Sequence, residues 1–141
     1  MVILDLEGKT KEDILLNIAK FAKEKGLIKN EQIVYQKFLE REQRGATGIG
    51  NGIALPEACW IEMNRPYAFI LCRTKESIDF QSLDGKPVRI ILASLGRDKN
   101  DLTRLKQMAN LTKFLKTQKL MERFLNAQSR DEVYALLQRG K

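Results

Sequence analysis

Two stretches near the start of the chain carry apolar residues at the spacing of amphipathic helices. The first begins after Thr10, has Glu12 and Asp13 in its first turn, and ends at Gly26. Its apolar side chains recur three or four positions apart and are Ile14, Ile18, Phe21 and Ala22. A polar cap, early acids and a final glycine are typical limits of a helix, so a helix is predicted between them.

The second stretch runs from Asn30 to about Arg44, and Val34 and Phe38 mark its inward side. Continuing that spacing by three positions leads to Arg41. Burying an unpaired charge is costly, so a guanidinium on the inward flank of a helix needs an anionic partner. We therefore expect an anion beside Arg41.

The middle of the chain predicts strands. Residues 67–73 (YAFILCR) and 88–94 (VRIILAS) are nearly continuous apolar runs, which is typical of central strands covered on both faces. Residues 52–55 predict a shorter strand, and residues 83–87 (LDGKP) predict a turn.

The last third of the chain predicts three helices, at about 99–116, 118–126 and 130–138. Helices on either side of a strand-rich middle indicate an α/β fold. We expect a single domain, residues 1–141, with a mixed β-sheet flanked by helices on both faces.

Composition narrows the class of protein. The 141 residues suit one domain, and 43% hydrophobic residues is ordinary for a globular protein. The longest apolar run has six residues and acids follow the first methionine closely, so neither a membrane segment nor a secretory signal is expected. Two cysteines without a CxxC pattern predict no disulfide framework, no metal site and a cytoplasmic location.

The absence of histidine excludes whole classes of chemistry. Ser-His-Asp and Cys-His relays, HExxH metal sites and phosphohistidine all require an imidazole. Any catalysis would have to use carboxylates, Cys, Lys, Tyr or backbone donors, and no cofactor is predicted.

Positive charge is concentrated in the second half of the chain. The net charge is +7, and much of the excess lies between Arg104 and Arg123, on Lys106, Lys113, Lys116 and Lys119. The stretch contains one aromatic residue, Phe114, at a spacing that fits an apolar face, and no recognised nucleic-acid motif. An acidic protein is therefore the expected partner of this face, rather than a nucleic acid.

The segment from Ala46 to Trp60, ATGIGNGIALPEACW, has glycines at alternate positions. Gly48, Gly50 and Gly52 permit positive φ and leave backbone N–H groups uncovered, which suits an anion. A tight loop beside a strand explains the same spacing, because the third glycine of a dinucleotide fingerprint and the Lys-Ser/Thr of a P-loop are missing. The Thr47 hydroxyl either binds an anion or forms a hydrogen bond within the loop itself.

Two carboxylates and one thiol are the candidate reactive groups. Glu57 follows Pro56, whose fixed φ sets the direction of the chain. Asp101 lies in the first turn of a predicted helix whose apolar stripe is Leu102, Leu105, Met108 and Ala109. Cys59, two residues beyond Glu57, is a candidate thiolate nucleophile.

Together these residues resemble the enzyme IIA domain of the fructose/mannitol type in the bacterial sugar phosphotransferase system, a group that includes the nitrogen-regulatory IIA proteins. The family pattern is an Arg-Glu pair followed by T-G-x-G-x-G-I-A-x-P-H. Here it reads Arg41-Glu42 and then residues 47–56, with Glu57 in place of the histidine. Residues 84–88 (DGKPV) resemble the family's D-G-x-P-V. The helix after Asp101 resembles its H-L-x-x-L-x-x-L-A motif, with Asp101 in place of the second histidine. The match covers about residues 9–139.

The resemblance implies a fold, a reaction and partners. In that family the first histidine accepts a phosphoryl group from HPr or a related carrier and passes it to a cysteine of a IIB domain. The arginine and the second histidine lie beside the acceptor. The resemblance carries over Arg41 and Thr47 as residues, and Glu57 and Asp101 as positions only.

Three hypotheses follow for this chain. In the first it is a regulatory module that cannot be phosphorylated, in which Glu57 imitates the phosphorylated acceptor and the surrounding face binds a carrier, a IIB domain or a regulator. In the second it is a working phosphotransferase that uses Glu57 or Cys59. In the third Glu57 and Asp101 form a carboxylate pair that binds a divalent cation or acts in hydrolysis. The resemblance implies a phosphotransferase family, but the absence of both family histidines argues against enzymatic activity in this chain.

Overall fold

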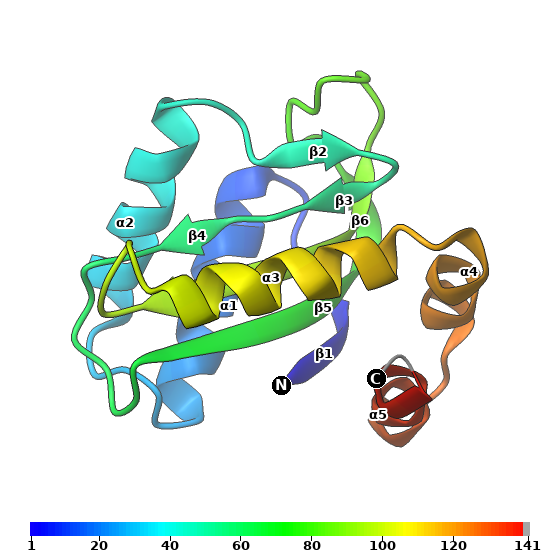
Figure 1. Ribbon diagram of the computed structural model, residues 1–141. Coiled ribbons are helices and arrows are strands. Elements are labelled where there is room, and N and C mark those ends of the chain that lie inside the picture. Colours follow the sequence, from blue (N-terminus) through cyan, green and yellow to red (C-terminus); the bar gives the residue numbers. More distant parts are fainter. Residues whose placement is uncertain (140–141) are drawn as a thin grey trace.

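The computed structural model describes residues 1–139, and the last two residues of the expected domain, 140 and 141, lie outside the described part. Strands and helices follow one another along the chain as shown in Figure 1. The strands are β1 (Val2–Leu6), β2 (Gly48–Gly50), β3 (Ile53–Ala54), β4 (Glu57–Ala58), β5 (Tyr67–Ile78) and β6 (Val88–Gly96). The helices are α1 (Lys11–Glu24), α2 (Glu31–Gln43), α3 (Leu102–Leu115), α4 (Gln118–Asn126) and α5 (Arg130–Arg139).

The six strands form one mixed sheet in the order β1-β5-β6-β3-β2, and β4 also pairs with β6. Strands β5 and β6 are antiparallel and form its long centre. Strand β1 runs parallel to β5, while β3 and β4 run parallel to β6 at successive positions along it. The site described below lies where β4 meets β6.

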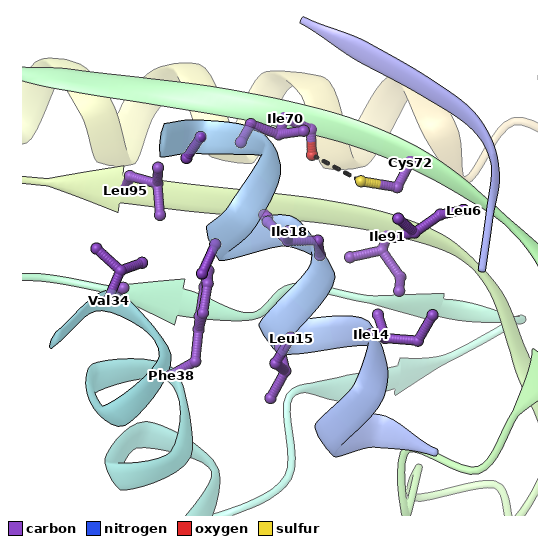
Figure 2. Close-up of a cluster of buried hydrophobic side chains, with 14 of the residues drawn as sticks. Leu6, Ile14, Leu15, Ile18, Val34, Phe38, Ile70, Cys72, Ile91 and Leu95 are labelled. Atoms are coloured by element: carbon purple, nitrogen blue, oxygen red, sulfur yellow. Dashed lines mark hydrogen bonds between the residues drawn. The ribbon is translucent and has the colours of Figure 1, made fainter. Parts of the chain in front are cut away.

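Helices cover both faces of the sheet, as expected (Figure 1). One core contains α1 and α2, and Figure 2 shows Ile14 and Ile18 of α1 beside Ile91 of β6, with Phe38 of α2 farther along the same core. The other core contains Leu115 of α3 and Phe124 of α4 against the opposite face. In β6, Ile91 and Ala93 belong to the first core and Ile90 and Leu92 to the second. Because both faces are buried, the strand reads as a continuous apolar run.

The predicted helices and central strands are confirmed, with shifted ends. The helix expected at 99–116 begins at Leu102, because Asp101 is its N-cap. Three strands were not predicted: β1, β2 and β4. Each has five residues or fewer and is defined by its neighbours in the sheet rather than by a local pattern.

Candidate functional site

Glu57 lies on β4, at the point where this strand pairs with the centre of the sheet. Its register partner on β6 is Ser94, and the Ser94 N–H donates to the carbonyl of Pro56 at 3.0 Å. The backbone of Glu57 is therefore fixed by the sheet.

Two arginines bind the Glu57 carboxylate. Nη1 of Arg104 donates to Oε2 of Glu57 at 3.2 Å, and Nε of Arg41 lies 3.9 Å from Oε1. The Glu57 side chain is 15% exposed and that of Arg104 is 0% exposed. The anionic partner predicted for Arg41 is thus Glu57. The shorter and more deeply buried contact, however, comes from Arg104.

Arg104 is held by a set of acceptors around its guanidinium. Nη1 also donates to Oγ of Ser94 at 2.7 Å, and Nη2 donates to the carbonyl of Lys99 at 2.9 Å. Its Nε has no hydrogen-bond partner among the described residues. A methyl group on Gly96 would lie 3.3 Å from this nitrogen, so glycine there leaves room for the guanidinium. Glu57 is the one carboxylate described within 4.0 Å of this buried cation.

The predicted inward stripe of α3 is correct only in part, and it omits Arg104. Leu105 and Met108 are half-buried, but Leu102 is 79% exposed and Ala109 is also exposed. The buried side chains of the helix are Arg104 and Leu115, and Met108 and Leu111 join them at intervals of four, three and four. Leu105, Thr112 and Phe114 are also half-buried. Extending the stripe backward from Met108 would have indicated Arg104.

Asp101 has a structural contact rather than the contact with Glu57 that the third hypothesis requires. Its carboxylate accepts the N–H of Arg104 at 3.2 Å and caps α3. No contact between Asp101 and Glu57 is described within residues 1–139. This geometry offers no support for a cation-binding or hydrolytic pair, and those residues contain no cluster of three or more His, Cys, Asp or Glu suited to a metal ion.

The glycine segment is a β-hairpin rather than a cradle around Glu57. Strands β2 and β3 are antiparallel, and Gly50 at the end of β2 and the turn residues Asn51 and Gly52 have positive φ. The Asn51 N–H, a candidate anion donor, donates to the Asp84 carboxylate at 3.1 Å. The side chains described around Glu57 are arginines, and no glycine N–H contacts its carboxylate within the described residues.

Thr47 and Gly48 also have structural contacts. The Thr47 hydroxyl donates to Oε2 of Glu42 at 2.6 Å, and its N–H donates to Oε1 at 3.2 Å. Lys11 Nζ donates to the same Oε1 at 3.0 Å. A side chain at Gly48 would collide with Ser82. The two residues of the Arg-Glu pair therefore have different contacts. Glu42 binds Thr47 at the start of the hairpin, whereas Arg41 contacts Glu57.

A hollow of about 310 Å³ opens in front of the carboxylate. Its wall on α2 consists of Lys37, Glu40 and Arg41, with Arg44 just beyond the helix. Its remaining lining residues are Glu57, Cys59, Trp60 and Lys99. The Trp60 side chain is 59% exposed.

Cys59 lies in this hollow as a protonated thiol rather than a thiolate. Burial, with a smaller effect of the Glu57 charge, raises its pKa above the ordinary range, and Arg104, Lys99 and Arg44 offset only part of this. Because the nucleophilic form is the thiolate, the raised pKa weakens the case for Cys59 as a phosphoryl acceptor.

We expect iodoacetamide to alkylate Cys59 slowly at pH 7. Because the pKa is raised, the rate should still be increasing at pH 9, where a peptide thiol approaches its plateau. Mass spectrometry of the labelled chain measures this rate, and Cys59→Ser identifies the site because Cys72 is fully buried. A rate plateau reached below pH 8 would contradict the assignment.

No helix among the described residues has the length and apolar character that crossing a bilayer requires.

Comparisons with known proteins agree with this architecture. The sequence profile of the family described as "Phosphoenolpyruvate-dependent sugar phosphotransferase system, EIIA 2" matches residues 1–140. The "Nitrogen regulatory protein homolog" of Haemophilus influenzae is 30% identical over 92% of this chain and 80% of its own length. The "PTS system fructose-specific EIIABC component" of Bacillus subtilis is 28% identical over 95% of this chain, which spans 21% of that longer protein.

Solved structures show the same fold. The crystal structure of the nitrogen regulatory protein IIA-Ntr from Neisseria meningitidis has a TM-score of 0.81, with 24% identity, and the match covers 96% of this chain and 92% of that one. The Escherichia coli complex of enzyme IIAMtl with phosphorylated enzyme IIBMtl gives 0.79, with 22% identity and 98% and 94% coverage. The mixed sheet and the family match lead to one conclusion: this chain belongs to the EIIA 2 family of the phosphoenolpyruvate-dependent sugar phosphotransferase system.

Proposed function

We propose that this chain is a regulatory IIA-type component in which Glu57 stands at the phospho-acceptor position and cannot itself take up a phosphoryl group. The observation that carries the proposal is the contact of Glu57 with the fully buried guanidinium of Arg104 at 3.2 Å. A carboxylate held in this way forms an ion pair with a buried cation. A phospho-acceptor, in contrast, must be free to take up and release a phosphoryl group.

The electrostatic argument supports imitation of a phosphorylated state. A phosphorylated side chain carries about −1.5 to −2 charges, and a carboxylate supplies a permanent −1 with fewer acceptor oxygens. Arg41 and Arg104 provide the cations that such a charge requires. The face around Glu57 therefore keeps one charge state whatever the supply of phosphoryl groups.

The same contacts argue against a working phosphotransferase. Both oxygens of Glu57 face guanidinium groups, so attack on a phosphoryl group would have to break an ion pair with a buried cation. The neighbouring thiol has a raised pKa. Acyl phosphates do form on carboxylates in other enzymes, so transfer remains the alternative that the experiment below addresses.

The proposed partner is a protein that recognises IIA domains. The Escherichia coli complex named above joins a IIA protein to a phosphorylated IIB protein, so a IIB-type partner is the first candidate here. A phosphoryl carrier of the HPr type and a regulator are the other two candidates.

Incubation with a phosphorylated HPr-type carrier, followed by intact-mass measurement at neutral pH, tests the proposal. We expect no added phosphoryl group on the wild-type chain. A stoichiometric mass increase, lost in Glu57→Gln, would contradict the proposal and establish transfer.

Partner capture tests the imitation of the phosphorylated state separately. With a IIB-type domain as bait, we expect wild type to bind at least tenfold more tightly than Glu57→Gln, because the amide removes the charge and nearly keeps the shape. Glu40→Gln removes a more exposed carboxylate of the same hollow and serves as the matched control. Equal capture of wild type and Glu57→Gln, with both variants folded by circular dichroism, would remove the idea of imitation.

A further inference from the structure

The hollow in front of Glu57 has more positive charge than its carboxylates neutralise. Of its two acids, Glu40 lies 3.8 Å from Lys37, and Glu57 is bound by Arg41 and by the buried Arg104. Arg44 and Lys99 also line the hollow, and no ion pair is described for either within residues 1–139. Two cations that line the hollow therefore have no described carboxylate partner.

Trp60 provides a flat apolar surface beside these charges. Its neighbours Cys59 and Ile61 are both buried, and the Ile61 N–H donates to the carbonyl of Gly96 at 3.3 Å. Between these two anchored residues the backbone of Trp60 has a φ of 61°, an uncommon value for a bulky side chain. The indole is left 59% exposed while it lines the hollow. Backbone strain of this kind is typical of binding sites.

We propose that this hollow binds a nucleoside phosphate, with Arg44 and Lys99 contacting the phosphate and Trp60 contacting the base. Basic side chains satisfy the phosphate oxygens, and an indole stacks on any of the bases. The volume of about 310 Å³ lies at the lower end of the range for small-molecule sites, about 300–1,000 Å³, which suits one nucleotide.

This proposal goes beyond the regulatory function above and does not depend on it. Nucleotide binding requires the cations and the indole, whereas imitation of a phosphorylated side chain requires Glu57. Each proposal can fail while the other holds.

The single tryptophan of the chain makes the site directly measurable. Full-length wild-type protein is titrated with AMP, GMP, CMP and UMP at 150 mM salt while Trp60 fluorescence is followed, and calorimetry gives the affinities. We expect a saturable change in fluorescence with at least one monophosphate. Adenosine and ribose 5-phosphate each lack one part of a nucleotide, and inorganic phosphate lacks both base and sugar. All three should bind at least tenfold more weakly than the best nucleotide.

Two variants locate the contacts. The double variant Arg44→Gln/Lys99→Gln should weaken nucleotide binding at least tenfold, and so should Trp60→Ala measured by calorimetry. The matched control is Lys20→Gln/Lys86→Gln, which removes the same charge from two exposed positions outside the hollow and should leave the affinity unchanged. The proposal is overturned if no monophosphate binds at millimolar concentration, if phosphate alone binds as tightly, or if the control weakens binding as much.

Discussion

Replacing Glu57 with alanine is expected to lower the free energy of unfolding by about 3 kcal/mol, because it removes the described carboxylate partner of a buried guanidinium. Arg104 is 0% exposed, so the surrounding water cannot solvate its charge once the carboxylate is gone. Urea unfolding followed by circular dichroism measures the change. Glu40→Ala is the matched control, since the Glu40 carboxylate lines the same hollow and is more exposed. This substitution should change the free energy of unfolding by less than about 0.5 kcal/mol.

A small anion should partly restore the stability of Glu57→Ala. The variant leaves a gap beside Arg41 and Arg104, and formate is small enough to supply the missing carboxylate there. We expect 100 mM formate to raise the unfolding midpoint of this variant more than the same concentration of chloride does, and to leave wild type unchanged. If Glu57→Ala were as stable as wild type in chloride, the buried ion pair would be without energetic importance.

The second large effect is expected far from the site, at Arg73 on β5. Its buried guanidinium donates from Nη1 to the carbonyls of Phe124, Leu125 and Ala127, at 3.2, 3.3 and 2.6 Å. These carbonyls end α4 and begin the link to α5, so Arg73 holds the C-terminal helices on the sheet. We expect Arg73→Met to cost about 3 kcal/mol, since charge-assisted hydrogen bonds to buried carbonyls are lost.

Hydrogen exchange distinguishes this role from general destabilisation. Amides of α4 and α5 should exchange faster in Arg73→Met at denaturant concentrations where α1 is still protected. Asp5→Asn is the control, because it removes the exposed ion-pair partner of Arg73 and leaves the carbonyl bonds intact. Uniform acceleration across all helices, or an equal loss in Asp5→Asn, would contradict the assignment.

The long helices and strands are predicted well from the sequence because the pattern of their apolar residues is local and characteristic of each element. The helix containing Ile14 and Ile18 and the strand containing Ile90 and Ile91 are both found where the pattern places them. Strand β4 has two residues and no pattern of its own, and its partner β6 lies more than thirty positions away. Pairing at that separation is decided by the whole fold.

Some residues of the candidate site can likewise be predicted from the local sequence, and others cannot. Arg41 can be predicted to face an anion because it continues an apolar stripe, and Glu57 is that anion. Arg104 was missed because two leucines of the same helix, Leu102 and Leu105, suggested a different inward face. The side chain of an arginine can lie on the inward face only where a carboxylate and carbonyls meet it, and these come from β4 and the loop before α3. The glycine spacing correctly indicated positive φ at Gly50 and Gly52, though not at Gly48, and a hairpin uses this conformation as readily as an anion site does.

The buried guanidinium also bears on how this chain can change through evolution. Substituting a neutral imidazole for the acid at position 57 would leave Arg104 with a charge that no carboxylate described within 4.0 Å offsets. A chain with histidine at position 57 is therefore expected to be less stable, and a neutral side chain at position 104 would remove the uncompensated charge. We therefore expect positions 57 and 104 to vary together among close homologues of this sequence.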